Sequence, residues 1–191
     1  MRVIRVADQI ATPWKNGQGV TREIAAHPPG AGLADFDWRV SIAKVDASGP
    51  FSHFPDMDRR LGILEGVLAL KIDGGAAIKL CPNAGAIAFP GDVPVHAEVL
   101  EGPVTDLNVM SRRGRYQTTM TRLRIEAAAT IAVSKRTMIV LQSGAAALTF
   151  KGQGQGLQAQ DAACFESQAA ARVLVEPSEP TSLFVIEIAG R

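Results

Sequence analysis

The residues with the densest potential chemistry form one stretch near the N-terminus, Pro13-Trp14-Lys15-Asn16-Gly17-Gln18-Gly19-Val20-Thr21-Arg22-Glu23-Ile24. Asn16-Gly17 predicts a tight turn, because both residues tolerate a positive φ. Thr21 and Glu23 are two apart in the run that follows, so on a strand both point to one face. We therefore predict a β-hairpin that gathers an indole, an ammonium, an amide, a hydroxyl and a carboxylate round one small volume: Trp14, Lys15, Asn16, Thr21 and Glu23. The simpler interpretation is a hairpin whose polar residues are only solvated.

Polar residues also alternate with apolar ones in two later runs. Asp106 and Asn108 lie two apart in one run and Arg39 and Ser41 in another, so on strands each pair shares a face. The interior of a small closed barrel is normally apolar, and an unpaired buried polar group is costly. These faces therefore either contact water or surround a bound molecule.

Two cations of the chain, Arg59 and Lys15, are able to clamp a ligand carboxylate. A guanidinium offers a fork of donors to a carboxylate, so Arg59 suits this task better than Lys15. Trp14 and Phe89 supply flat surfaces for a planar ligand. Asp58 precedes Arg59, and the alternative is that these two form an ordinary ion pair. The candidate ligand-binding residues are Trp14, Lys15, Asn16, Thr21, Glu23, Arg39, Asp58, Arg59, Phe89 and Asn108.

The composition is that of a soluble globular protein, with 47% apolar and 20% charged residues in 191 and a net charge of +1. Nucleic-acid binding needs an extended cationic surface, and the chain offers only Arg112-Arg113-Gly114-Arg115, so we expect no such partner. No apolar run approaches the ~20 residues that span a bilayer, and residues 1–11 lack the apolar core of a signal peptide. We expect no membrane association. Cys81 and Cys164 form no CxxC pair, which favours the reducing cytoplasm.

Short strand-like runs separated by turn residues dominate the chain and predict an all-β sandwich or barrel. The predicted strands are 2–6, 21–25, 37–45, 61–64, 67–72, 77–80, 86–89, 95–100, 104–110, 116–124, 130–133, 138–141, 146–150, 164–165, 173–175 and 182–188.

Three segments recur at an offset of about 77 residues, which indicates two similar antiparallel β units. Leu64-Glu65-Gly66 is echoed at Leu141-Gln142-Ser143-Gly144, and Gly102-Pro103-Val104 at Glu179-Pro180-Thr181. The third pair is Ala86–Phe89 and Ala162–Phe165. We expect residues 1–115 to hold the N-terminal segment and a site-bearing first unit. Residues 116–191 should form a degenerate second unit, packed with the first as one compact body.

A series of motifs in this chain resembles the signature of the HutD/Ves family, beginning with the Trp-Lys-Asn-Gly turn and Thr21 and Glu23. The others follow in order up to about Arg115: Phe36-Asp37-Trp38-Arg39-Val40-Ser41, Gly49-Pro50-Phe51-Ser52 with Phe54-Pro55, Asp58-Arg59, Leu64-Glu65-Gly66, Phe89-Pro90-Gly91-Asp92 and Asp106-Leu107-Asn108-Val109-Met110. The resemblance implies a cupin-like (RmlC-like) bicupin of two antiparallel β-barrel or jelly-roll units. It also favours Asn108 as an inward-facing residue.

The resemblance further implies a metal-free protein that binds a small organic acid, N-formylglutamate or urocanate, and modulates histidine utilisation. The expected ligand contacts are charge partners (Lys15, Arg59), hydrogen-bonding groups (Asn16, Thr21, Asn108), a polar wall (Glu23) and an aromatic wall (Trp14). One alternative is a metal-independent isomerase or hydrolase with Glu23 or Asp58 as general base. Another is a regulatory scaffold for a protein partner. An unpaired sheet edge also leaves a homodimer open.

A metal site is the remaining possibility that the residue types raise. His53, His96 and Glu65 can hold a metal only as a set of two histidines and one carboxylate, and their spacing does not require it. His27 lies in a proline-rich loop. We therefore expect no metal and no other cofactor.

Overall fold

The computed structural model describes residues 1–14, 19–166 and 169–191. Among these residues the only helix is a 3₁₀ turn at Val6–Asp8, and the remaining regular structure is β-strand. The all-β prediction is therefore confirmed. No helix within the described ranges is long and apolar enough to cross a membrane.

The chain divides into two compact units. The first unit holds Ile10–Gln117 with Arg191, and the second holds Met1–Gln9 with Thr118–Gly190. The N-terminal segment that we assigned to the first unit is thus shared, because β1 (Arg2–Ile4) pairs with β15 (Ala162–Phe165) of the second unit. The backbone of Val6 also donates to Asp161 Oδ1 there.

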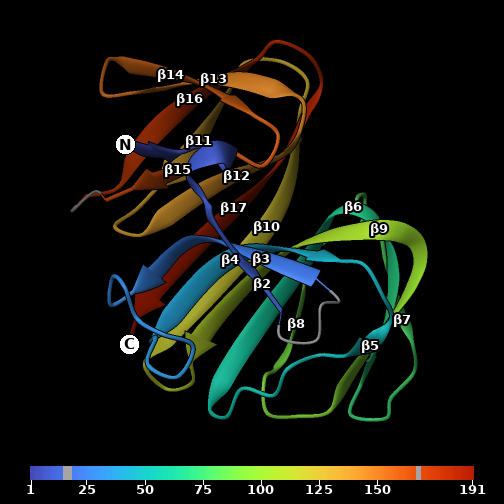
Figure 1. The fold of residues 1–191 in the computed structure, drawn as a ribbon. Helices are drawn as coiled ribbons and strands as arrows, with labels where there is room; N and C mark the ends of the chain where they lie inside the picture. The colour runs from blue at the N-terminus through green and yellow to red at the C-terminus, as the bar shows by residue number, and fades with distance from the viewer. Residues whose placement is uncertain (15–18, 167–168) are drawn as a thin grey trace. The chain divides into compact units, whose positions relative to one another are not determined.

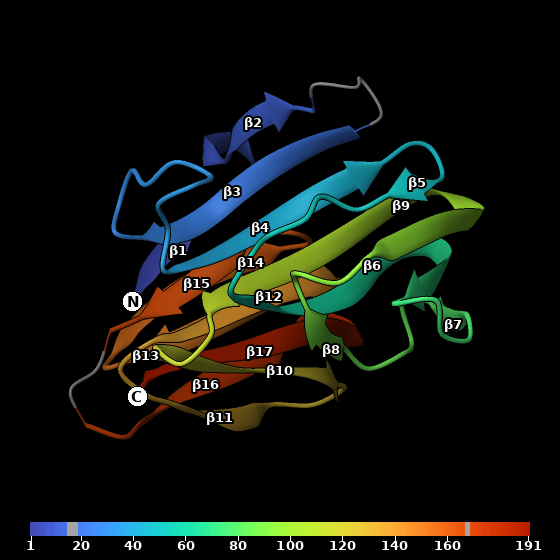
Figure 2. The ribbon, with the colours of Figure 1, turned by 90° about the horizontal axis from the view of Figure 1, so that it is seen from below.

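The first unit is one large antiparallel sheet in the order β2-β3-β4-β9-β6-β7, and Figure 2 shows its first five strands side by side. Two short strands lie off this path, β5 on β9 and β8 on β6. The strands are β2 (Ile10–Pro13), β3 (Gly19–His27), β4 (Trp38–Val45), β5 (Gly49–Pro50), β6 (Met57–Ile72), β7 (Ile78–Leu80), β8 (Ile87–Pro90) and β9 (Val95–Arg112).

Strands β6 and β9 are each longer than the sequence predicts, because two predicted strands are continuous in each of them. Their ladder is irregular between Ile63 and Leu68, where bulges shift the register, and bulges bend a strand without ending it. Figure 1 shows the resulting curve of β9. Both halves of β6 contribute to one apolar core, Leu61 from the first half and Leu70 from the second, so the sheet curls round that core.

The second unit consists of two sheets, ordered β1-β15-β12-β17-β10 and β11-β16-β13-β14. Its core is apolar and includes Leu141, Phe165 and Leu183. Besides β1 and β15, its strands are β10 (Tyr116–Ile125), β11 (Ala129–Val133), β12 (Thr137–Ser143), β13 (Ala145–Phe150), β14 (Gln153–Gln158), β16 (Ala171–Pro177) and β17 (Thr181–Gly190).

Each unit has a glycine with a positive φ at the position that the sequence repeat aligned. Gly66 has a φ of 78° and Gly144 a φ of 80°, a region that side chains disfavour. A Cβ on Gly66 would lie 2.7 Å from the carbonyl oxygen of Pro103, and one on Gly144 would lie 3.3 Å from that of Pro180. Each unit thus brings a left-handed glycine against the equivalent Xaa-Pro segment.

Candidate functional site

Strand register places most of the predicted site residues on one face of the first unit. Residues directly opposite on neighbouring antiparallel strands share a face, so the pairing of β3, β4, β9, β6 and β8 defines three cross-strand rows. The first row is Arg39, Met110, Arg59 and Phe89, the second is Glu23, Ser41, Asn108 and Leu61, and the third is Thr21, Ala43, Asp106 and Ile63. Because Leu61, Ile63 and Phe89 belong to the apolar core, this is the inner face of the sheet.

Arg59 is the most deeply buried cation on this inner face, with 5% of its surface exposed. Its guanidinium carbon lies 5.0, 5.1 and 5.8 Å from the ring centroids of Phe51, Phe89 and Phe54, which is cation–π range. The Nη1 atom donates a long bond of 3.4 Å to the Ser52 carbonyl. Burial lowers the pKa of Arg59 to about 10, against the opposing charge of Asp106, so the group stays protonated at neutral pH.

Three polar atoms of the inner face are buried and have no hydrogen-bond partner among the described residues: Arg59 Nε, Asp106 Oδ1 and Asn108 Oδ1. Asp106 is 2% exposed, and its burial raises its pKa to about 7 although the charge of Arg59 opposes that rise. Buried polar atoms are nearly always bonded in folded proteins. Their gathering on one face therefore indicates a place for a polar ligand.

The same face is more exposed toward β3. Arg39 Nε donates to Glu23 Oε2 at 2.8 Å, and about a third of the Glu23 side chain reaches solvent. Trp14 packs against the core and its Nε1 donates to Thr21 Oγ1 at 2.7 Å. The inner polar face thus runs from a solvated carboxylate at Glu23 to a buried guanidinium at Arg59.

Two of the predicted ligand contacts, Lys15 and Asn16, lie outside the described residues, and so does the turn predicted at Asn16-Gly17. The strands that flank that turn do pair as a hairpin, β2 with β3, and the backbone of Trp14 donates to Gly19.

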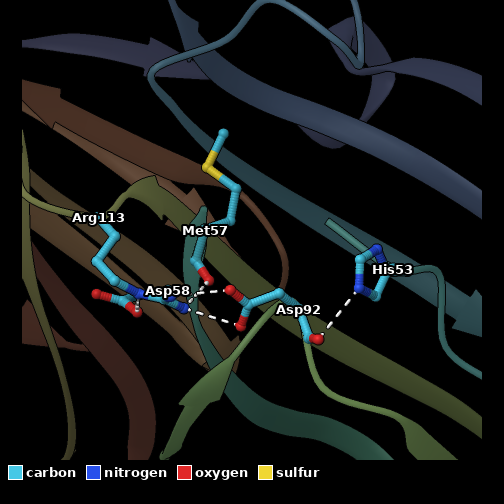
Figure 3. Close-up of polar contacts among 5 residues, drawn as sticks. All are labelled: His53, Met57, Asp58, Asp92 and Arg113. Atoms are coloured by element: carbon cyan, nitrogen blue, oxygen red, sulfur yellow. Dashed lines mark hydrogen bonds and ion pairs between the residues drawn. The ribbon is translucent and has the colours of Figure 1, made fainter. Parts of the chain in front are cut away.

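Asp58 is not among the residues that the inner face brings together, because it precedes Arg59 on β6 and points to the opposite face. It pairs with Arg113, whose Nε lies 2.9 Å from Asp58 Oδ1 (Figure 3). The same guanidinium binds both carboxylate oxygens of Asp92, at 2.8 and 3.0 Å, and the Met57 carbonyl. The ion pair of Asp58 with Arg59 that we considered is therefore replaced by this Arg113 clasp.

The Arg113 clasp holds the loop that carries the aromatic neighbours of Arg59. His53 Nε2 lies 3.1 Å from the Asp92 carbonyl oxygen (Figure 3), and the backbone of Phe54 donates to Gly91. Asp92 has a lowered pKa, chiefly because Arg113 donates hydrogen bonds to it. The clasp thus anchors the segment that brings Phe51 and Phe54 to the guanidinium.

The three residues considered for a metal do not meet. In the part of the chain that the structure describes, no three histidine, cysteine, aspartate or glutamate side chains form a group able to hold a metal ion. His53 binds the Asp92 carbonyl as above, and His96 is exposed on β9, opposite Lys71.

The second unit carries a cavity of about 690 Å³, lined by Arg5, Ala147, Gly156, Asp161 and Ser178 among others. Its charged residues are already bonded to their surroundings. Asp161 accepts hydrogen bonds from Arg5, from the backbone of Val6 and from the backbone of Gln158. We therefore locate the candidate site on the inner face of the first unit.

Sequence reasoning left Asp106, Phe51 and Phe54 out of the site. Alternation did place Asp106 on the face of Asn108, and that signal was sufficient to include it. The two phenylalanines lie in a loop without periodicity, and only the fold brings them to Arg59.

Comparison with known proteins assigns the family. The HutD family model matches residues 6–182. Protein Ves of Cronobacter sakazakii is 39% identical over 103 residues, which cover 53% of this chain and 55% of that protein. An uncharacterized 21.2 kDa protein in the hutC 3′ region of Pseudomonas putida is 37% identical over 118 residues, 61% of each chain. The chain thus spans little more than half the length of these curated relatives.

Solved structures match over almost the whole chain. A conserved protein of unknown function from Pseudomonas aeruginosa PAO1 has a TM-score of 0.90 and 34% identity, covering 98% of this chain and 97% of that one. HutD from Pseudomonas fluorescens SBW25, in a formate condition, has a TM-score of 0.83 and 26% identity, covering 100% and 98%. A cupin 2 conserved barrel domain protein from Leptotrichia buccalis, at 10% identity and TM-score 0.65 over 98% and 96%, shares the fold alone. The chain is therefore a β protein of cupin fold and belongs to the HutD family.

Proposed function

We propose that this protein binds a small organic acid on the inner face of its first unit and modulates histidine utilisation through that binding. Arg59 is the observation that carries the proposal. It is a buried guanidinium whose Nε has no hydrogen-bond partner among the described residues, and leaving a buried donor without an acceptor is costly. A ligand carboxylate supplies the missing partner.

The neighbours of Arg59 fit the rest of such a ligand. Asn108 offers amide chemistry one row away, and its Oδ1 is also unpartnered within the described chain. Phe89 and Trp14 give flat apolar surfaces on the same core. An acid with a short polar or planar body, such as formylglutamate or urocanate, suits this set of groups.

Relatives supply the link to the pathway. One curated relative lies in the hutC 3′ region, and the HutD structure was obtained in a formate condition. These findings support a small carboxylate as ligand and histidine utilisation as its setting.

A thermal-shift and calorimetric screen tests the proposal with formate, urocanate, formylglutamate and glutamate. An acid present at a hundred times its Kd should stabilise the fold by about 2.7 kcal/mol. Arg59→Met should abolish this shift, whereas Arg124→Met, which removes an exposed arginine paired with Glu126 in the second unit, should preserve it. A wild-type protein that responds to no acid, or an Arg59→Met protein that binds like wild type, would overturn the proposal.

A metal-independent enzyme is the second candidate, and Asp106 favours it. A buried carboxylate with a pKa near 7 is poised for general acid–base chemistry at neutral pH. NMR spectra of each acid incubated with the protein separate the two functions: a changed ligand spectrum indicates turnover, and a constant spectrum with a thermal shift indicates binding only.

A further inference from the structure

We propose that the first unit binds the carboxylate of its ligand together with one proton, which Asp106 takes up. This inference rests on the proposed acid-binding function and concerns how the same site balances charge. Its basis is the arrangement of charged side chains round Asp106 on the inner face.

Few charged groups share that face with Asp106. Arg59 comes from β6, two cross-strand rows from Asp106, and its charge lowers the pKa of Asp106 against the larger effect of burial. Arg39 of β4 and Glu23 of β3 are bonded to each other at 2.8 Å. On β9 itself, Arg112 lies three rows away and is tied to Asp37 at 3.2 Å. The inner positions of β2 and β8 carry apolar or hydroxyl side chains, including Thr12, Ile87 and Phe89.

The charges of the described inner face are therefore balanced only while Asp106 is ionised and offsets the charge of Arg59. A ligand carboxylate that binds Arg59 adds a second negative charge to this buried region, and an uncompensated buried charge is costly. Protonation of Asp106 restores the balance. It also turns a buried acceptor, the unpartnered Oδ1 or its companion oxygen, into a carboxyl group with one donor for the ligand.

Burial has already prepared Asp106 for this step. Its pKa stands at about 7 before any ligand is present, and a second anion nearby raises it further. Near pH 6 the carboxyl group of Asp106 is largely protonated already, so ligand binding takes up only a small fraction of a proton. Near pH 8 it is ionised, and each binding event must draw a proton from solvent.

Calorimetry of the full chain with sodium formate measures this coupling, because formate itself stays ionised from pH 6 to pH 8.5. We expect the affinity to fall toward tenfold for each pH unit above about 7, as linkage to one proton requires. Titrations at pH 8 in buffers of different ionisation enthalpy should report uptake that approaches one proton. This buffer series needs no variant.

Two carboxylate variants locate the proton. Asp106→Asn keeps the shape of the side chain and stays neutral, so its formate affinity should not depend on pH and its proton uptake should vanish. Asp58→Asn alters a carboxylate on the opposite face of β6 and should keep the wild-type dependence.

The outcomes separate this inference from the proposed function. Formate binding that Arg59→Met abolishes but that is independent of pH would overturn the proton coupling and leave acid binding intact. A wild-type slope in a folded Asp106→Asn protein would also overturn it, because the proton would then go elsewhere. A wild-type protein that binds neither formate nor any other acid in the screen at any pH would overturn the proposed function itself.

Discussion

Arg59, which we propose as the ligand-binding cation, illustrates how a buried charge works against folding. Its guanidinium gains cation–π contacts with three phenylalanines, yet it is desolvated, and its pKa falls to about 10 as a result. A buried ionic group is often less stabilising than an apolar side chain of similar volume. The net contribution of Arg59 to the free energy of unfolding of the unliganded protein can therefore be measured with variants at this position.

Replacing Arg59 by methionine should stabilise the unliganded protein. The flexible thioether fits among aromatic rings, and the desolvated charge disappears. At pH 6, where Asp106 is largely neutral, we expect the free energy of unfolding in urea to rise by about 1–4 kcal/mol. Arg59→Lys is the matched control, because it keeps a buried charge and loses the planar fork. A methionine variant less stable than the lysine variant would contradict this account.

Asp106 should make the stability of the protein depend on pH. The folded state raises its pKa from 3.8 to about 7, so between these values the folded protein binds more protons than the unfolded chain. Stability is therefore greatest below about pH 4 for this group and is lost as the pH rises through about 7. Urea unfolding from pH 5 to pH 8 should show a decline that is smaller in Asp106→Asn. Parallel curves for the two proteins would refute the assignment.

At the scale of single residues, the sequence is a good guide to which polar side chains share a face. Period-two alternation grouped Arg39 with Ser41 and Asp106 with Asn108, and the register places all four on the inner face. The same rule separates Asp58 from Arg59, which adjacency in the sequence had suggested as a pair. The partner of Asp58 is Arg113, far along the chain, and only the tertiary fold supplies that contact.

At the scale of elements, Gly66 lies in the bulged part of β6. Its substitution separates the cost of a left-handed backbone from the cost of a close contact. Gly66→Ala forces a side chain into a left-handed conformation, at about 1–2 kcal/mol, and places its Cβ 2.7 Å from two backbone carbonyl oxygens. Gly74→Ala is the matched control in the same unit, because Gly74 has a φ of 69° but nothing within 4 Å of its Cβ position. We expect Gly66→Ala to lose clearly more unfolding free energy in urea. If Gly66→Ala and Gly74→Ala lost equal unfolding free energy, the close contact between the Cβ at position 66 and the backbone carbonyls would contribute nothing.

The sequence predicts a strand where the strand buries apolar side chains. It does so less well where the strand is held mainly by backbone pairing with its neighbour. Strand β10 follows from its alternating burial and strand β17 from its run of apolar residues. The sequence missed β14, because its Gln-Gly repeat has low β propensity, and pairing with β13 fixes it instead. It also missed that β6 and β9 run on through their bulges, because the glycines there resemble turn signals.

At the scale of the whole molecule, the two units repeat one pattern with different chemistry. In the first unit Leu61 pairs with Asn108 and Ile63 with Asp106, across β6 and β9. In the second unit Ile139 pairs with Val185 and Leu141 with Leu183, across β12 and β17. The repeat aligns Asp106 with Leu183 and Asn108 with Val185, and both of these apolar residues lie in the second core.

One acid should therefore bind per chain, although the fold contains two related units. The second core has Leu183 and Val185 at the positions of Asp106 and Asn108. Where Arg59 pairs with Met110 in the first unit, Thr137 pairs with Glu187 in the second, so these positions offer a carboxylate no guanidinium and a high desolvation cost. Calorimetric titration with the acid that binds most tightly should give a stoichiometry of one, and Arg59→Met should reduce it to zero. The charged cavity lined by Arg5 and Asp161 provides the control, because Arg5→Met should leave the stoichiometry at one. A stoichiometry of two, or a residual site that Arg5→Met removes, would place acid binding in the second unit as well.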